Sequence, residues 1–231
     1  MISQGMTDFD CDQISLDSPE KLAPRVILKN VAAYRDRLAT RRTVRDSSDE
    51  PINRSVIEAC VLAAGSAPSG ANHQPWHSAC VSDPDTKRAI CEAAEAEEQE
   101  FYGGRAGETW LNDLKNIGTD ASKPFQETAP CLIVIFAGRY GIDEKGARQR
   151  HYCVPESVGT AIEFLINAFH QLGIATLTHT PNPMKFLNQI LQRPSNERPY
   201  VLIVVGHPAR TAMVLRAATV KKYLGQIATF I

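Results

Sequence analysis

Hydrophobic residues recur at helical spacing in several parts of the chain. Within residues 25–40, Val26, Ile27, Val31 and Tyr34 follow one another at such spacings and predict a helix. The same spacing, or a composition rich in Ala and Glu, predicts further helices over residues 54–65, 85–101, 109–117, 156–172 and 184–191.

Short apolar runs between these helices are typical of buried strands. They cover residues 76–81, 130–137, 174–177 and 200–205. Helices and strands therefore follow one another in a mixed order, which predicts an α+β fold with a central mixed sheet flanked by helices. Residues 1–24 are mostly polar and predict a flexible lead-in, so that residues 25–231 form a single domain.

The end of the chain has a different pattern. The segment after Arg210 has no clear periodicity until Leu224, yet it ends in Ile227, Phe230 and Ile231. A loose tail of this kind would expose hydrophobic surface to water. We therefore expect an extended C-terminal tail that wraps around a partner subunit.

Charge and composition exclude several classes of protein. The 231 residues include 25 basic and 26 acidic side chains, so that the net charge is −1. A dedicated nucleic-acid binder usually carries a strong basic excess. The N-terminal residues lack the apolar stretch of a signal peptide, and no run approaches the roughly 18 apolar residues of a membrane helix. We expect a cytoplasmic protein that binds neither nucleic acid nor membranes.

The six cysteines give no sign of a metal centre. None of them belongs to a C-x-x-C pair, and several lie in apolar runs. We expect reduced, buried thiols, no metal site and no catalytic cysteine.

An arginine cluster is the first candidate for chemistry. Arg41, Arg42 and Arg45 lie within five residues, and Thr43 adds a hydroxyl group. Guanidinium groups bind phosphate through paired hydrogen bonds, which favours an anion site. A solvated basic helix end is the alternative interpretation, because the helix dipole stabilises positive charge there.

A loop of small residues is the second candidate. Pro68, Ser69, Gly70 and Ala71 begin a short segment that ends in Gln-Pro-Trp. Such a loop can bring backbone N–H groups close to a planar ligand. An ordinary helix-to-strand connection remains the alternative.

Three charged or polar side chains form the third candidate. Glu98 and Tyr102 are four residues apart and share one face of a helix, and Lys123 follows after a polar stretch. A carboxylate, a phenol and an ammonium group could bind a zwitterionic amino acid. A solvated helix face with an isolated surface lysine is the alternative for each residue alone.

Two of these motifs together resemble the nitroreductase superfamily. They are R-R-T-V-R at residues 41–45 and A-P-S-G-A-x-x-Q-P-W at residues 67–76. The resemblance implies a domain-swapped α+β homodimer that binds FMN in a groove at its interface. In that family Arg41, Arg42 and Thr43 would bind the phosphate end and Arg45 the pyrimidine edge. Pro68 and Ser69 would line the ring from the other subunit, and Lys221 would reach the phosphate.

The third motif narrows the resemblance to the iodotyrosine deiodinase branch. The Glu-x-x-x-Tyr, W-x-x-D-L-K and downstream Lys pattern is similar to the active-site lid of that branch, here about residues 95–125. T-x-T-P follows at residues 178–181.

The branch implies roles for individual residues. Thr178 and Thr180 would contact the flavin, and the Thr180 hydroxyl would donate to N5 and so favour single-electron transfer. Glu98, Tyr102 and Lys123 would hold the zwitterion, and the backbone N–H of Ala71 would meet the substrate phenolate.

Two features depart from the branch pattern. Gly103 and Gly104 follow Tyr102 and should loosen the lid. His179 stands between the two threonines, where a smaller hydroxyl residue is common.

The resemblance implies an FMN-dependent enzyme that removes iodide, bromide or chloride from 3-halotyrosines. An external donor, such as an NAD(P)H-linked reductase, would supply the electrons. Three alternatives stay open: a general nitro- or quinone reductase that uses NAD(P)H, a flavin-degrading enzyme of the same superfamily, and a binding protein without turnover.

Overall fold

The computed structural model describes residues 14–16, 20–115 and 118–231. The chain divides into two compact units, residues 1–39 and residues 40–231. The first unit contains helix α1 (Pro24–Ala39), and the second contains the sheet and all the other helices. Most of the predicted lead-in over residues 1–24 lies outside the described residues, so it stays a prediction.

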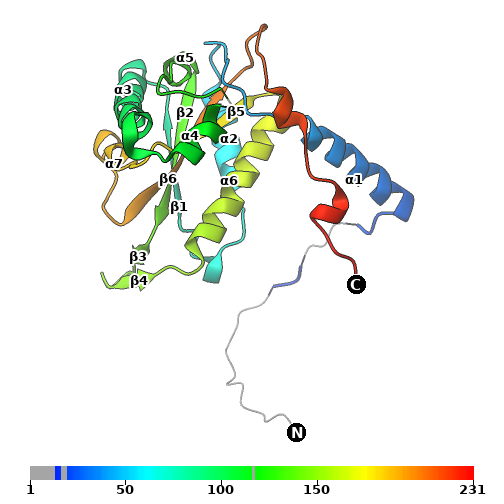
Figure 1. Cartoon of the computed structure of the whole chain (residues 1–231). Coiled ribbons are helices and arrows are strands. Elements are labelled where there is room, and N and C mark those ends of the chain that lie inside the picture. Colours follow the sequence, from blue (N-terminus) through cyan, green and yellow to red (C-terminus); the bar gives the residue numbers. More distant parts are fainter. Residues whose placement is uncertain (1–13, 17–19, 116–117) are drawn as a thin grey trace. The chain divides into compact units, whose positions relative to one another are not determined.

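A four-stranded sheet forms the centre of the larger unit (Figure 1). Its strands are β1 (Trp76–Val81), β2 (Cys131–Gly138), β5 (Ala175–His179) and β6 (Glu197–Gly206), in the order β1-β2-β6-β5. Neighbouring strands pair antiparallel, and β1 and β5 are therefore the two edges. One parallel bridge joins Thr43 to Thr176 and makes the sheet mixed at the β5 edge.

Helices cover both faces of this sheet (Figure 1). Helices α2 (Arg54–Gly65) and α6 (Val154–Gln171) pack together on one face, and α3 (Pro84–Glu100) and α7 (Phe186–Ile190) cover the other. Two further helices, α4 (Glu108–Lys115) and α5 (Phe125–Thr128), follow α3 along the chain. This arrangement confirms the predicted α+β class with helices around a central sheet.

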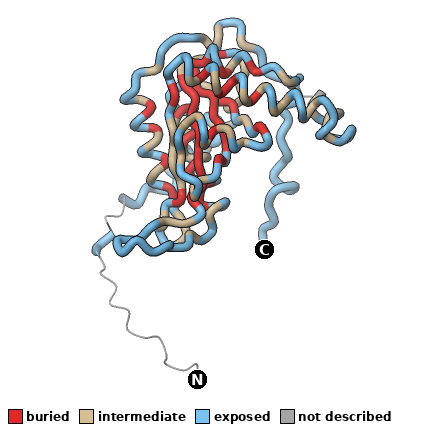
Figure 2. Tube along the Cα trace, turned by 90° about the vertical axis from the view of Figure 1, so that its left-hand side faces the viewer, coloured by how far each residue is buried: buried red, intermediate tan, exposed pale blue. Residues whose placement is uncertain are grey.

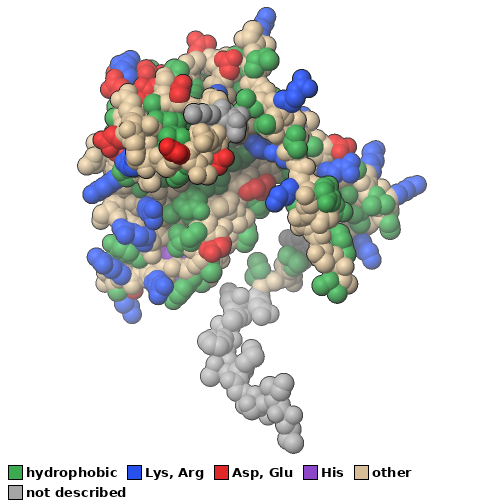
Figure 3. All heavy atoms as spheres, in the orientation of Figure 1, with side chains coloured by type: hydrophobic (Ala, Val, Ile, Leu, Met, Phe, Trp, Pro, Cys, Tyr) green, Lys and Arg blue, Asp and Glu red, His purple; other side chains and the backbone are tan. Residues whose placement is uncertain are grey.

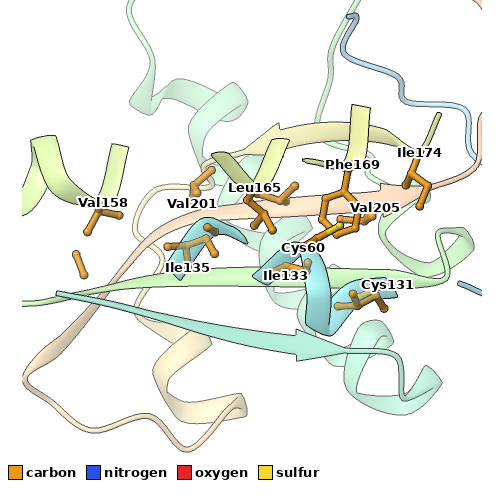
Figure 4. Close-up of a cluster of buried hydrophobic side chains, with 14 residues drawn as sticks. Cys60, Cys131, Ile133, Ile135, Val158, Leu165, Phe169, Ile174, Val201 and Val205 are labelled. Carbon is orange, nitrogen blue, oxygen red and sulfur yellow. The ribbon is translucent and has the colours of Figure 1, made fainter. Parts of the chain in front are cut away.

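The hydrophobic core lies in two layers, one on each face of strand β2. All eight of its residues are buried, and alternate side chains point to opposite faces. Ile133 and Ile135 join the cluster beneath α2 and α6 (Figure 4), whereas Leu132 and Val134 join the cluster beneath α3 and α7. The buried residues accordingly concentrate on the strands and on the inward faces of the helices (Figure 2).

The predicted helices and strands are all present, with bounds that differ by a few residues. For the predicted helix over 109–117, residues 116 and 117 lie outside the described part. Strand β6 begins at Glu197, before its predicted start, and its Pro199 pairs with Phe136 next to an irregularity between Ile135 and Phe136 of β2. Proline within sheets occurs at bulges and edges, because it cannot donate to the ladder.

Several short elements carry no clear signal in the sequence. They are the hairpin β3 (Tyr140–Ile142) and β4 (Arg148–Arg150), the 3-10 turns η1 (Gly70–Asn72), η3 (Arg216–Thr219) and η4 (Leu224–Gln226), and the π-helical turn η2 (Phe101–Arg105). Among the described residues, no helix combines the length and the apolar character that crossing a bilayer requires.

Removal of a buried side chain from α6 tests this core. Leu165 has no exposed surface, so Leu165→Ala leaves a cavity and should lower the free energy of unfolding by about 2–5 kcal/mol. Leu172, at the end of the same helix, is 57% exposed, and Leu172→Ala should cost less than about 1 kcal/mol. Urea titrations at one protein concentration measure both values, and equal losses would contradict the assigned core.

Candidate functional site

The edge strand β5 positions the candidate site. Its neighbours Leu177 and His179 point to the face covered by α3 and α5, whereas Thr178 points to the opposite face. Thr180 follows the strand directly. The same short segment therefore presents hydroxyl groups on one side and an imidazole on the other.

The arginine cluster lies along this edge because backbone hydrogen bonds hold it there. The Val44 N–H donates to the Thr176 carbonyl at 3.3 Å, and the Ser48 N–H donates to the His207 carbonyl at 2.8 Å. A Cβ atom on Gly206 would lie 2.9 Å from the Ser47 Cβ, so glycine permits the close approach. The docked segment places Arg45 beside the end of β5.

A cavity of about 280 Å³ opens at this place. It gathers six of the residues to which the sequence analysis assigned a role in binding. They are Arg45, Glu98, Tyr102, Lys123, Thr178 and Thr180. The remaining lining residues are Phe101, Trp110, Leu114, Thr119, Phe125, Leu177, His179 and Asn182. The fold therefore brings together the predicted zwitterion clamp and part of the predicted flavin site.

Glu98 lies between two nitrogen atoms in this cavity. Its Oε2 is 3.6 Å from the Lys123 Nζ, and its Oε1 is 3.1 Å from the His179 Nε2. Burial alone would raise the pKa of Glu98, but the His179 hydrogen bond and the Lys123 charge together outweigh it and lower that pKa. The carboxylate is therefore held ionised.

Lys123 is nearly inaccessible, with a side chain only 3% exposed. Its ammonium group donates to the Thr119 hydroxyl at 3.1 Å and to the Asp120 carbonyl, and lies 5.7 Å from the centre of the Tyr102 ring. Burial, with smaller effects from the charges of Glu98 and Asp120, raises the pKa of Tyr102 against a hydrogen bond to Thr119. The phenol of Tyr102 is thus a neutral hydrogen-bonding group beside a cation.

The helical lid that carries Glu98 changes direction at the glycine pair. Helix α3 continues into the π-helical turn, where Gly104 adopts φ 151°, a conformation that favours glycine. Arg105 reaches back to Glu97 at 3.0 Å, and the Phe101 and Trp110 rings meet edge to face at 5.0 Å. The pair thus permits a reversal of the chain, and the loosening of the lid stays a prediction.

Several residues predicted to contact a flavin have polar groups available for hydrogen bonding. Arg41 and Arg45 are half-buried, yet within the described part of the chain neither forms an ion pair with a carboxylate. The hydroxyl groups of Thr178 and Thr180 also make no side-chain hydrogen bond to another described residue. Guanidinium and hydroxyl groups in this condition suit an anionic, hydrogen-bonding ligand.

The loop with Pro68, Ser69 and Ala71 lies elsewhere. It leads into β1, at the opposite edge of the sheet from β5, and contributes no residue to the lining of the 280 Å³ cavity. Ala71, Asn72 and Gln74 all adopt positive φ angles of 47–54°. Backbone strain of this kind often accompanies a functional site.

Contacts with the start of α6 hold this loop in place. A Cβ on Gly70 would lie 2.7 Å from the Tyr152 carbonyl oxygen, and the Gly70 N–H donates to the Ser157 hydroxyl at 3.2 Å. Close packing at Gly70 therefore fixes the neighbouring Ala71, whose N–H donates no hydrogen bond to another described residue.

Lys221 lies in the C-terminal segment, where its side chain is exposed. Hydrophobic residues around it are exposed as well (Figure 3). They are Met213, Val220, Tyr223, Leu224, Ile227, Phe230 and Ile231, each at least 61% exposed. Within one chain, Lys221 does not line the 280 Å³ cavity.

Sequence reasoning did not assign a role to two polar residues, His179 in the lining of the cavity and Gln126 next to it. His179 contacts Glu98, and its Nδ1 lies 2.8 Å from the amide nitrogen of Gln126, which has no exposed surface. A signal existed for the histidine, because it occupies a core-facing position two residues after Leu177. Nothing in the sequence around Gln126 distinguishes it from a surface residue.

Two other cavities, of about 560 and 620 Å³, contain none of the predicted site residues. In the first of them Arg193 and Glu197 form a salt bridge at 2.6 Å, so these two charges largely cancel each other.

The antiparallel sheet, the docked arginine cluster and the threonine-bearing edge strand are those of a nitroreductase. Residues 38–207 match the family model described as "Nitroreductase family", and the chain belongs to that family. Among its relatives is the iodotyrosine deiodinase of Haliscomenobacter hydrossis, 51% identical over 191 residues that cover 83% of this chain and 86% of that protein. The iodotyrosine deiodinase of Nematostella vectensis is 43% identical over 187 residues, or 80% of this chain and 71% of that protein.

Solved structures agree with this family. A crystal structure of oxidised iodotyrosine deiodinase bound to FMN and 3-iodo-L-tyrosine superposes with a TM-score of 0.71 and 26% identity, covering 85% of this chain and 100% of the other. A BluB-like flavoprotein from Clostridium difficile has the same fold, with a TM-score of 0.66 and 20% identity over 85% of this chain and 98% of the other.

The lowered pKa of Glu98 has a consequence for stability. A carboxyl group whose pKa is lower in the folded chain than in the unfolded chain stabilises the fold. The effect is fully present above the ordinary pKa of about 4.3 and is lost as the pH falls through the lowered value. The difference in free energy of unfolding between the wild type and Glu98→Gln should therefore be largest near neutral pH and shrink below about pH 4.

Urea denaturation at several pH values measures this difference. Glu144→Gln, at an exposed position of the β3–β4 hairpin, is the matched control and should parallel the wild type. A difference between the wild type and Glu98→Gln that stays constant down to pH 3 would contradict the assigned electrostatics of the cavity.

Proposed function

We propose that this chain is an FMN-dependent reductive dehalogenase of 3-halotyrosines. The observation that carries the proposal is the single cavity in which Glu98, Tyr102 and Lys123 meet Arg45, Thr178 and Thr180. The relatives named iodotyrosine deiodinase, and the structure with FMN and 3-iodo-L-tyrosine, support it.

The residues present fit FMN. The half-buried guanidinium groups of Arg41 and Arg45, which form no ion pair with a carboxylate of the described part, suit a phosphate and an electron-rich ring edge. Arg41, Arg42 and Thr43 would hold the phosphate, and Arg45 would face the pyrimidine edge. The Thr178 and Thr180 hydroxyls would bind the ring, with that of Thr180 donating to N5. Bound FMN supplies the two electrons of the reaction.

The clamp residues would orient the substrate. Glu98 would bind its ammonium group, and Lys123 and the Tyr102 hydroxyl would bind its carboxylate. Two or three charge-assisted contacts, each of about 1.5–3 kcal/mol, would order the lid over the phenol and exclude water. In the overall reaction the carbon–halogen bond takes up two electrons and a proton, and releases halide and tyrosine.

A second copy of this chain would complete the site. The loop with Pro68, Ser69 and Ala71 adjoins β1, whereas Thr178 belongs to β5, and three strand spacings of roughly 4.8 Å separate these edges by about 14 Å. A cavity of about 280 Å³ is also smaller than the roughly 300–1,000 Å³ of a typical ligand pocket. We therefore propose a homodimer in which Pro68, Ser69 and the Ala71 N–H reach the ligands held by the partner.

The exposed C-terminal segment fits the same proposal. Its apolar side chains would be covered in a domain-swapped dimer, and Lys221 would approach the phosphate there. An NAD(P)H-linked reductant and a cytoplasmic location belong to this proposal.

Sedimentation tests the homodimer. The full chain should sediment at twice its monomer mass, because the exposed apolar tail needs a partner surface. Removal of residues 213–231 should weaken the dimer and the binding of FMN, whereas removal of residues 1–13 should change neither. A full-length monomer with a normal FMN affinity would refute the shared site.

Halide release tests the reaction itself. The FMN-loaded protein is reduced anaerobically and mixed with 3-iodotyrosine, while flavin reoxidation and free iodide are followed together. One iodide per flavin with rapid reoxidation is the expected result. A parallel sample receives a nitroaromatic compound, and rapid reoxidation there without iodide release from 3-iodotyrosine would favour a general nitroreductase.

Glu98→Gln is the matched variant in this assay. It should bind FMN as the wild type does and lower kcat/KM for 3-iodotyrosine by about tenfold to 100-fold, since it removes a charged partner of the ammonium group. Unchanged kinetics would refute the clamp while leaving the flavin site in place.

A further inference from the structure

Three polar side chains from three different elements form a continuous chain that begins in the cavity at Glu98 and His179 and ends at the buried Gln126. The Gln126 amide nitrogen of α5 lies 2.8 Å from the His179 Nδ1 of β5, and the His179 Nε2 lies 3.1 Å from the Glu98 Oε1 of α3. We propose that His179 is a positioning residue, which holds the Glu98 carboxylate in place to receive the ammonium group of an amino-acid substrate. This inference rests on the proposed function, because it concerns the same site.

Both nitrogen atoms of the imidazole have a partner. Nδ1 lies beside the Gln126 amide, and Nε2 faces the Glu98 oxygen. An ionised carboxylate only accepts hydrogen bonds, so Nε2 is the donor in this contact. His179 thus donates a hydrogen bond to the carboxylate while Gln126 contacts its other nitrogen.

The burial of Gln126 indicates that this contact is its main polar interaction. The side chain has no exposed surface, and its Oε1 has no hydrogen-bond partner within the described part of the chain. Burying an amide with an unpaired oxygen destabilises the fold. The one hydrogen bond of this amide that the structure describes goes to His179.

His179 and Lys123 approach the two oxygens of the Glu98 carboxylate. The His179 and Glu98 side chains are only 11% and 13% exposed, so the orientation of the carboxylate is restricted. Lys123 approaches the other oxygen at 3.6 Å. The contacts at both oxygens therefore hold the carboxylate in one orientation for an incoming ammonium group.

The position of His179 links this contact to the other side of the site. Thr178 and Thr180 flank it in sequence, and all three line the same cavity. A short hydroxyl side chain at this position could not span the distance from β5 to Glu98. The histidine therefore lets one segment of backbone position both the predicted flavin contacts and the Glu98 carboxylate.

Binding of two ligands that differ only in the ammonium group distinguishes a positioning role of His179 from a purely structural one. The first is 3-iodotyrosine, and the second is 3-(3-iodo-4-hydroxyphenyl)propanoate, the same molecule without its ammonium group. Dissociation constants are measured by flavin fluorescence on the oxidised, FMN-loaded protein, and kcat and KM are measured separately.

His179→Ala should weaken the binding of 3-iodotyrosine by about tenfold and raise its KM similarly, with little change in kcat. Binding of the propanoate should change less than about twofold, since it has no group for Glu98 to bind. His179→Gln, which restores an N–H donor, should recover most of the affinity for 3-iodotyrosine.

Two further variants provide a second test and a control. Gln126→Leu removes the partner of Nδ1 and should weaken 3-iodotyrosine binding a few-fold without affecting the propanoate. His77→Ala removes a half-buried histidine from the opposite edge strand β1 and should leave both ligands unaffected.

The outcomes distinguish this inference from the proposed function. An equal loss of affinity for both ligands, or no loss for either, overturns the role of His179. Wild-type protein that binds 3-iodotyrosine in a His179-dependent way but releases no halide overturns the dehalogenase and leaves the positioning role. Wild-type protein that binds neither ligand overturns both.

Discussion

Backbone pairing along the edge strand β5 is the constraint on which the candidate site depends. On its outer side Thr176 pairs with the arginine segment through Thr43 and Val44, and on its inner side the strand pairs with β6. Because side chains alternate along a strand, the residues that follow Thr176 point in turn to the face covered by α3 and α5 and to the opposite face. Arg45, the threonine hydroxyls and Glu98 therefore line one cavity at the end of this strand.

The opposite charges of Glu98 and Lys123 compensate one another in the cavity of the single chain. Glu98 and Lys123 lie 3.6 Å apart and are both largely buried, so each lowers the cost of burying the other. A zwitterion carries one charge of each sign and can exchange this internal pair for two contacts without changing the net charge of the cavity. In the proposed function, such an exchange makes the site selective for amino acids over simple phenols.

The Ala71 loop and the C-terminal tail both lie away from the cavity. The loop with Ala71 is rigid and closely packed against the start of α6, while the tail with Lys221 exposes its apolar side chains. Neither segment reaches the cavity at β5 within one chain, as the lining of that cavity shows for the described residues. In the proposed dimer, the Ala71 loop and the tail would both contribute to one site.

Local spacing in the sequence determined much of this protein. Apolar periodicity predicted the main helices and strands, since their burial follows from a pattern that repeats within each element. The four-residue spacing placed Glu98 and Tyr102 on one helix face, whereas the anion site at the arginine cluster of residues 41–45 stays a prediction. The β3–β4 hairpin escaped prediction because exposed residues such as Arg148 and Arg150 give no apolar alternation.

Only the tertiary structure decided which distant side chains meet. The approach of Lys123 to Glu98 depends on how the lid folds back, and the sequence resemblance could only imply it. The contact from Gln126 through His179 to Glu98 joins three elements that are far apart in sequence. No local pattern encodes such a contact, because a hydrogen bond across the fold depends on packing and register rather than on the neighbours of each residue.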